Sequence, residues 1–197
     1  MWPWEHALFA YVCYSLYLRG RYRSRPADWP VVALALGSAF PDLVDKPLAW
    51  QFGFFESGYA VAHSVFVAVP ASLVLVAVAR RYRRERIGIA FATGHLLHLV
   101  GDVLPASLSS QTLYLAPVLW PVAPSRVIVD RGSFAAGVRG LLTEYVAQLL
   151  TLDLTAVIAL QIGSVIVGVV LWFADGLPGL MLVRSTVGRT MEYRRGD

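Results

Sequence analysis

The sequence predicts an all-α fold, a polytopic transmembrane helical bundle of about five spans. Hydrophobic residues make up 57% of the chain and charged residues only 15%, whereas a soluble domain carries about a quarter charged residues. Several stretches approach the roughly 20 apolar residues that a helix needs to cross a bilayer. Arginines gather in short loops between those stretches, which is typical of membrane topology. We therefore expect one integral membrane domain over residues 1–197.

The apolar stretches give the expected order of elements. Residues 1–121 should hold the helices of a metal site and an interfacial segment, residues 138–175 further helices, and residues 176–197 a basic tail. The second span is short and should end between Pro41 and Pro47. An amphipathic helix is expected at 138–152, after a stretch at 105–132 that is too rich in proline and serine for a regular span. The five expected spans are 4–18, 29–47, 59–79, 87–104 and 154–173.

Positive charge follows the first, third and fifth of these spans. The first two runs are 19–25 and 80–86, and the tail carries Arg184, Arg189, Arg194 and Arg195. Loops rich in arginine stay on the cytoplasmic side. The chain is therefore expected in the plasma membrane, with its N-terminus outside and its C-terminus in the cytoplasm. The same distribution, in short loops beside apolar segments, argues against a nucleic-acid partner and leaves membrane lipids as the expected surroundings.

Histidine and aspartate residues gather on one side of this scheme. Spans of alternating direction bring them to the outer side of the bundle, although arginines alone define this expected topology. Ionisable groups within membrane spans are costly and usually functional. Each one alone could be explained by a hydrogen bond between helices; together they predict a metal-binding or proton-handling site. The residues are His6, Asp42, Asp45, His63, His98 and Asp102.

Within the fourth span, the spacing supports metal binding. His98 and Asp102 are four residues apart and therefore share one face of a helix. His95 lies three residues before His98 on the same face and is a second-rank candidate. Imidazole nitrogens and carboxylate oxygens are the usual ligands of catalytic zinc. One or two divalent ions, with zinc favoured, are therefore expected as cofactor.

Several segments resemble the YdjM-like family of membrane-bound metal-dependent hydrolases. They are Gly37-Ser-Ala-Phe-Pro41-Asp42-Leu-Val-Asp45, Ala62-His63-Ser64, Gly94-His-Leu-Leu-His98-Leu-Val-Gly-Asp102 and Leu115-Ala-Pro-Val-Leu-Trp-Pro121, together with His6 at the start of the first helix. The resemblance covers residues 1–121. The run from His98 to Asp102 is also similar to the metal-binding helix of zinc-dependent phospholipase C. Many relatives carry His-x-Gly-x-Thr-His-Ser, but this chain has Gly58-Tyr-Ala-Val-Ala-His63-Ser64. The first histidine and the threonine of that motif are missing here, so a site with one metal ion and a site with two both stay open.

The resemblance implies a hydrolase of a phosphoester or lipid substrate that uses metal-activated water. It implies His6, Asp42, His63, His98 and Asp102 as metal ligands, and Asp45 is the expected general base, or Asp42 if that residue is not a ligand. A site in the outer leaflet suits a substrate that arrives laterally from the lipid. Two alternatives stay open: a metal or proton carrier that uses the same cluster, and a regulatory membrane protein in which the cluster is only structural.

Overall fold

The computed structural model describes residues 2–123, 133–151, 155–180 and 182. Over these residues the fold is all-α, as predicted: the described chain forms helices and a short 3-10 turn and no strand. The arginines of the predicted tail, Arg184, Arg189, Arg194 and Arg195, lie outside the described residues. The elements are α1 (Pro3–Tyr22), α2 (Asp28–Trp50), α3 (Val65–Arg81), α4 (Glu85–Ser110), η1 (Ala116–Val118), α5 (Phe134–Leu150) and α6 (Ala156–Ala174).

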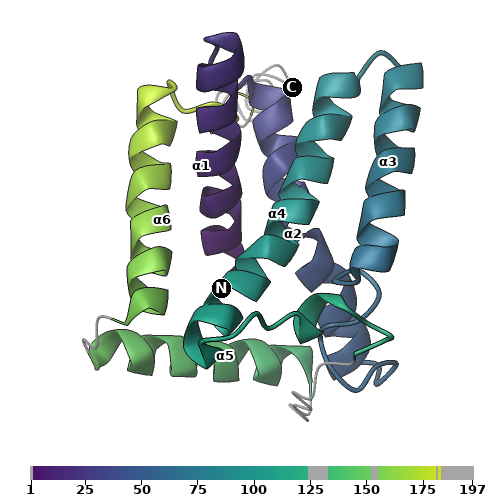
Figure 1. Ribbon diagram of the computed structural model, residues 1–197, viewed down its shortest axis with the longest axis vertical. Helices are drawn as coiled ribbons and strands as arrows, with labels where there is room; N and C mark the ends of the chain where they lie inside the picture. The colour runs from purple at the N-terminus through teal and green to yellow at the C-terminus, as the bar shows by residue number, and fades with distance from the viewer. Residues whose placement is uncertain (1, 124–132, 152–154, 181, 183–197) are drawn as a thin grey trace, which may run out of the picture.

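Five of these helices run alongside one another, and α5 lies across one end of them (Figure 1). The connections from α1 to α2 and from α3 to α4 lie at the opposite end (Figure 1). These connections carry the first two runs of arginine, so positive charge and α5 occupy opposite ends of the described bundle.

Helices α2 and α4 approach each other unusually closely because of two glycines. A Cβ atom added to Gly37 would lie 2.1 Å from the backbone oxygen of Phe91 on α4. A Cβ atom added to Gly94 would lie 2.1 Å from the backbone oxygen of Leu34 on α2. Since real Cβ atoms do not come so close to backbone oxygen, only glycine permits this packing. It brings the first half of α2 against the first half of α4.

The outer faces of α3 and α6 are apolar and uncovered. On α3, Leu73 and Val74 are 67% and 63% exposed, and on α6, Val170 and Phe173 are both 61% exposed. Large exposed apolar faces mark contact with another apolar phase. The faces of these two helices are therefore suited to contact with lipid.

By length and composition alone, fewer described helices qualify as membrane spans than the sequence predicts. Among the described helices, α4 and α6 are long and apolar enough to cross a membrane. Helix α3 has 17 residues and is therefore about 25 Å long, which is short of a hydrocarbon core of about 30 Å. Helices α1 and α2 carry charged residues near their ends. The five-span bundle is therefore not confirmed.

Three predicted boundaries are wrong. Helix α2 continues through Pro41 and Pro47 to Trp50, and α4 continues through Pro105 to Ser110. A proline inside a helix removes one backbone donor and its ring crowds the carbonyl four residues before it, and packing between neighbouring helices can offset that cost. Helix α3 begins at Val65 and not near Tyr59, because the backbone N–H groups of the preceding loop donate to Asp45 instead of forming a helical turn.

Candidate metal centre

The predicted site residues come from four parts of the fold. His6 lies in the first turns of α1, Asp42 and Asp45 in α2, His63 in the loop before α3, and His98 and Asp102 in α4. Their side chains meet in the interior at the end of the bundle where α5 lies. All are buried, with exposed fractions between 0 and 8%.

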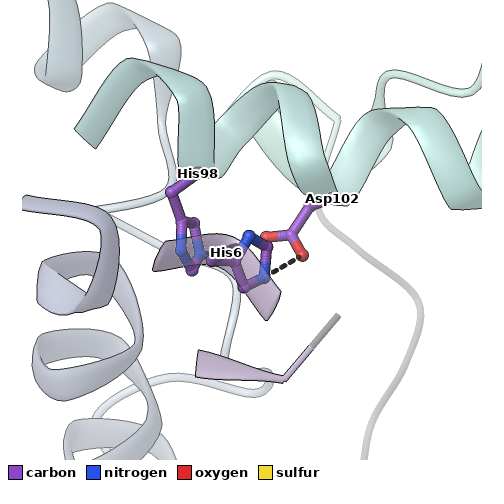
Figure 2. A group of neighbouring side chains, drawn as sticks. All are labelled: His6, His98 and Asp102. Atoms are coloured by element: carbon purple, nitrogen blue, oxygen red, sulfur yellow. Dashed lines mark ion pairs between the residues drawn. The ribbon is translucent and has the colours of Figure 1, made fainter. Parts of the chain in front are cut away.

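Two groups of ligand atoms, each compact enough to hold a metal ion, lie side by side and share His98. One contains His6, His98 and Asp102, and the other contains Asp42, His63 and His98. Figure 2 shows the first group: His98 and Asp102 project from α4 toward His6 of α1, and Nε2 of His6 is 3.3 Å from Oδ1 of Asp102. The rings of His6 and His98 are stacked, with centroids 3.9 Å apart. Whether the groups bind a metal stays a prediction.

The atoms at the junction of the two groups are close together. Nε2 of His98 lies 3.1 Å from Nε2 of His63 and 3.2 Å from Oδ2 of Asp102. Nε2 of His63 lies 3.4 Å from Oδ1 of Asp42 and 3.5 Å from Oδ2 of Asp102. Two imidazole nitrogens therefore face each other between two carboxylates.

The hydrogen bond made by Nδ1 of each histidine determines whether its Nε2, which faces the other ring, carries a proton or a lone pair. Nδ1–H of His98 donates to the backbone carbonyl of Ser38 at 2.6 Å, because a carbonyl can only accept. Nδ1–H of His63 donates to Asp45 at 2.8 Å. In the neutral rings, both Nε2 atoms therefore present lone pairs. Two lone pairs 3.1 Å apart repel unless a proton or a metal ion lies between them.

The surroundings of His63 favour positive charge at this point. Burial alone lowers the pKa of His63, but hydrogen bonds to Asp42 and Asp45 and the nearby Asp102 raise it to about 9. Without a metal ion, a proton on His63 would supply that charge. A proton would still leave other atoms unpaired: among the described residues, Nδ1 of His6 and one oxygen each of Asp42 and Asp102 are buried and make no hydrogen bond. Imidazole nitrogens and carboxylate oxygens with buried atoms left unpaired are a donor set that fits a divalent metal ion.

Asp45 is fully buried, and both of its oxygens accept hydrogen bonds. The backbone N–H groups of Ala60, Ala62 and His63 donate to it at 2.9–3.0 Å, in addition to the His63 ring. The predicted role of Asp45 as general base is not tested by these contacts. They show directly that Asp45 orients His63 and holds the loop before α3.

His95 is directed away from both groups. Its Nε2 lies 2.9 Å from the backbone carbonyl of Ala62, and its ring packs against Phe40. It shares the face of α4 with His98 but reaches the loop and not the junction. His95 therefore holds the loop before α3 and lies outside both groups.

Two further charged residues lie beside the site. Nζ of Lys46 lies 2.6 Å from Oδ1 of Asp42, one turn earlier on α2. Glu5 is fully buried and accepts hydrogen bonds from the backbone of Trp2 and from the side chains of Tyr145 and Gln161. A glutamate in the first turn after Pro3 is the available sequence signal, since such residues cap helix N-termini.

The comparisons with known proteins give a family and no closer relative. No curated protein and no solved structure matches the chain. The model of the family described as "YdjM inner membrane protein" matches residues 1–178. The match therefore extends beyond the segments between residues 1 and 121 that carry the resemblance, and includes α5 and α6. The chain belongs to the YdjM inner membrane protein family.

Proposed function

We propose that this membrane protein is a metal-dependent hydrolase of a phosphoester or lipid substrate. One observation supports the metal most strongly: the lone pairs of His63 and His98 face each other at 3.1 Å between two carboxylates. Each ring is held in that tautomer by a hydrogen bond from its far nitrogen. Metal-binding histidines have this second hydrogen bond almost without exception.

The separations suit zinc. A tetrahedral zinc ion with bonds of about 2.0–2.1 Å places neighbouring ligand atoms roughly 3.3 Å apart. The separations from Nε2 of His63 and His98 to each other and to Asp42 and Asp102 are 3.1–3.8 Å. His63, His98 and Asp102 would therefore hold one ion and leave a fourth position, beside Asp42, open for water. His6, at 3.3 Å from Asp102, would orient that carboxylate or bind a second ion.

A bound zinc ion supplies a Lewis acid that activates water and polarises a phosphoryl oxygen. The residues of the chain supply the rest. Asp45 and the Ser38 carbonyl hold the two imidazole rings in place. Asp42 keeps one oxygen without a hydrogen bond, whereas both oxygens of Asp45 are occupied. Asp42 is therefore the carboxylate better able to accept a proton from the attacking water, and Asp45 the predicted alternative.

We also propose how the helices lie in the membrane. Helices α1, α2, α3, α4 and α6 form five spans, with the arginine loops in the cytoplasm and the metal centre at the outer boundary. Helix α5 lies across the outer end, in the plane of the membrane surface. A substrate reaches this end of the bundle from the lipid.

The test compares metal content and hydrolysis in purified protein. Wild-type protein, reloaded with zinc, should bind metal stoichiometrically and cleave at least one member of a panel of lipid phosphoesters. His98→Ala should lose both properties, because His98 belongs to both groups. His95→Gln is the matched control, since it alters a buried histidine one turn away on the same helix. Wild-type protein that stays metal-free after reloading would disprove the proposal, as would equal loss of metal in both variants.

A further inference from the structure

A cavity of about 370 Å³ lies beside the candidate metal centre, between α2 and α5. Asp42 and Tyr59 are among the residues that line it, and Leu43, Val138 and Leu141 are among its apolar lining residues. Pockets for small ligands usually have volumes of about 300–1,000 Å³, mostly apolar walls and a few polar groups. This cavity has those properties and opens directly onto a predicted metal ligand.

Helix α5 covers the cavity and is attached on both sides of it. Near its N-terminal end, Gly137 packs on the ring of Trp50, and the backbone N–H of Phe134 donates to the side chain of Gln51 at 3.3 Å. Near its C-terminal end, the hydroxyl of Tyr145 donates to Glu5 at 2.8 Å. Val138 and Leu141 lie between these attachments, on the face of α5 that lines the cavity.

Lys46 supplies the positive charge in this cavity. Its ammonium lies 2.6 Å from Asp42 and 5.8 Å from the centre of the Trp50 ring, and its side chain is 15% exposed. A lysine in this position can donate a charge-assisted hydrogen bond to an anion beside the metal ligands. Glu144 also lines the cavity, from an exposed position on α5.

The outer face of α5 indicates how a ligand reaches the cavity. Leu142, Val146 and Leu150 on this helix are 45%, 46% and 75% exposed, and Arg139 and Thr143 are exposed beside them. A helix that exposes both apolar and polar residues lies at a membrane surface with its apolar residues in the lipid. The cavity beneath it is therefore adjacent to lipid and not to bulk water alone.

We infer that this cavity binds an amphiphile with an anionic phosphate head group and one alkyl chain. The head group lies against the ammonium of Lys46, and the chain lies along Leu43, Val138 and Leu141. Binding in the cavity does not depend on a metal ion, because the cavity and Lys46 are present without one. Only the hydrolysis of the bound molecule rests on the proposed function. The inference identifies the substrate class of the proposed hydrolase.

Photolabelling tests the inference on the full chain in nanodiscs of phosphatidylcholine. The probe is dodecyl phosphate with a diazirine in the middle of its chain, and labelled residues are mapped by mass spectrometry. Label should concentrate on the cavity-facing residues of α2 and α5. Unlabelled dodecyl phosphate should suppress it, whereas dodecanol should not. Loss of one charge-assisted contact should lower labelling in Lys46→Met roughly tenfold, and Lys46→Arg should retain most of it.

A second variant covers the case in which Lys46→Met does not fold. Val138→Trp fills the cavity from α5 without changing any charge, and it should also abolish labelling of α2. Label spread equally over the lipid-facing residues of α3 and α6, or undiminished in a folded Lys46→Met or Val138→Trp protein, would disprove the inference.

The experiment separates the inference from the proposed function because it measures binding in metal-free protein. Labelling confined to the cavity, with no hydrolysis after zinc is restored, would support the inference and contradict the hydrolase. Zinc-dependent hydrolysis with labelling elsewhere would contradict the inference alone.

Discussion

The facing imidazole nitrogens of His63 and His98 depend on residues that do not touch the junction. Asp45 accepts the ring N–H of His63, and the Ser38 carbonyl accepts that of His98. Outer partners of this kind fix the tautomer and the ring orientation, and their loss typically costs 10–100-fold in metal affinity. The loop that carries His63 is held by the same aspartate through its backbone. One side chain therefore controls both the position and the tautomer of His63.

Asp45→Asn should weaken metal binding without abolishing it. The amide has one acceptor oxygen in place of two, so it cannot satisfy three backbone donors and the His63 ring together. Zinc affinity, measured by competition with a chelator, should fall roughly 10–100-fold. Glu56→Gln is the control: it alters an exposed carboxylate in the same loop and should leave affinity unchanged. An unchanged affinity in a folded Asp45→Asn protein would show that Asp45 does not orient a ligand.

At the scale of elements, the contact between α2 and α4 determines how the ligands meet. Gly37 and Gly94 allow the two backbones to approach, and Asp42 and His98 follow them by one turn or so on their own helices. Their relative position therefore depends on the separation of the helices.

Gly94→Ala should push α2 and α4 apart. The new methyl group would lie 2.1 Å from the Leu34 carbonyl oxygen, which belongs to backbone and cannot move away independently. Overpacking of this kind costs about 1–3 kcal/mol and occasionally more, and the displaced ligands should also lower zinc affinity. Unfolding in a denaturing detergent and chelator competition measure the two effects.

Gly163→Ala is the matched control for this substitution. Gly163 lies within α6, and a Cβ atom there would meet no atom within 4 Å. Alanine favours helix over glycine by about 1 kcal/mol, so this variant should be as stable as wild type or more stable. Equal stability of the two variants would contradict the close contact between α2 and α4.

A polar cluster outside the candidate metal centre attaches α6 to α1. Asp175, at the end of α6, accepts hydrogen bonds from Tyr11, Ser15 and Arg19 on α1. Burial alone raises the pKa of Asp175, but these hydrogen bonds and the charge of Arg19 lower it below the usual 3.8. Because the pKa is lower in the folded state, ionised Asp175 stabilises the fold above about pH 4. That contribution is lost as the pH falls through the folded-state pKa.

Asp175→Asn should destabilise the protein at neutral pH. Loss of the hydrogen bonds to a charged acceptor should cost about 1.5–3 kcal/mol, measured by detergent unfolding at pH 7. The difference from wild type should shrink as the pH is lowered below 4, since wild-type Asp175 then becomes protonated. A difference that stays constant between pH 7 and pH 3 would show that the charge of Asp175 is not what stabilises the contact.

For the whole molecule, the separation of arginine loops from the metal centre predicts its orientation in the membrane. After replacement of Cys13 by alanine, single cysteines at Ser24 and Glu56 report on the two ends of the bundle. An impermeant maleimide added to spheroplasts should label Glu56→Cys at once, but Ser24→Cys only after permeabilisation. The reverse pattern would place the metal centre on the cytoplasmic side.

Two alternative functions of the whole molecule, a metal or proton carrier and a regulatory membrane protein, stay predictions. A carrier requires metal or proton flux across liposomes that contain the purified chain. A regulatory protein would bind metal without hydrolysing any member of the substrate panel. These two measurements, with the hydrolysis assay, distinguish the three functions.

Local patterns predicted much of the fold and part of the site. Runs of apolar residues predicted helices wherever the described chain has long ones, and the spacing of His98 and Asp102 predicted that they share a face. Helix ends at Pro41 and Pro105 were predicted wrongly, because packing against neighbouring helices offsets the missing backbone donor. The part that Glu5 plays was not predicted, since its partners Tyr145 and Gln161 are distant in the sequence.

The sequence by itself determined the helical class and the membrane family, and it predicted the residues of the candidate site, because composition and spacing along one helix are local properties. Tertiary structure alone decided that His63 faces His98, that Asp45 stands behind His63, and that α5 closes a cavity over Lys46. These relationships join residues on different elements. They depend on how closely α2 and α4 pack and on where α5 crosses the bundle, which no pattern within one segment contains.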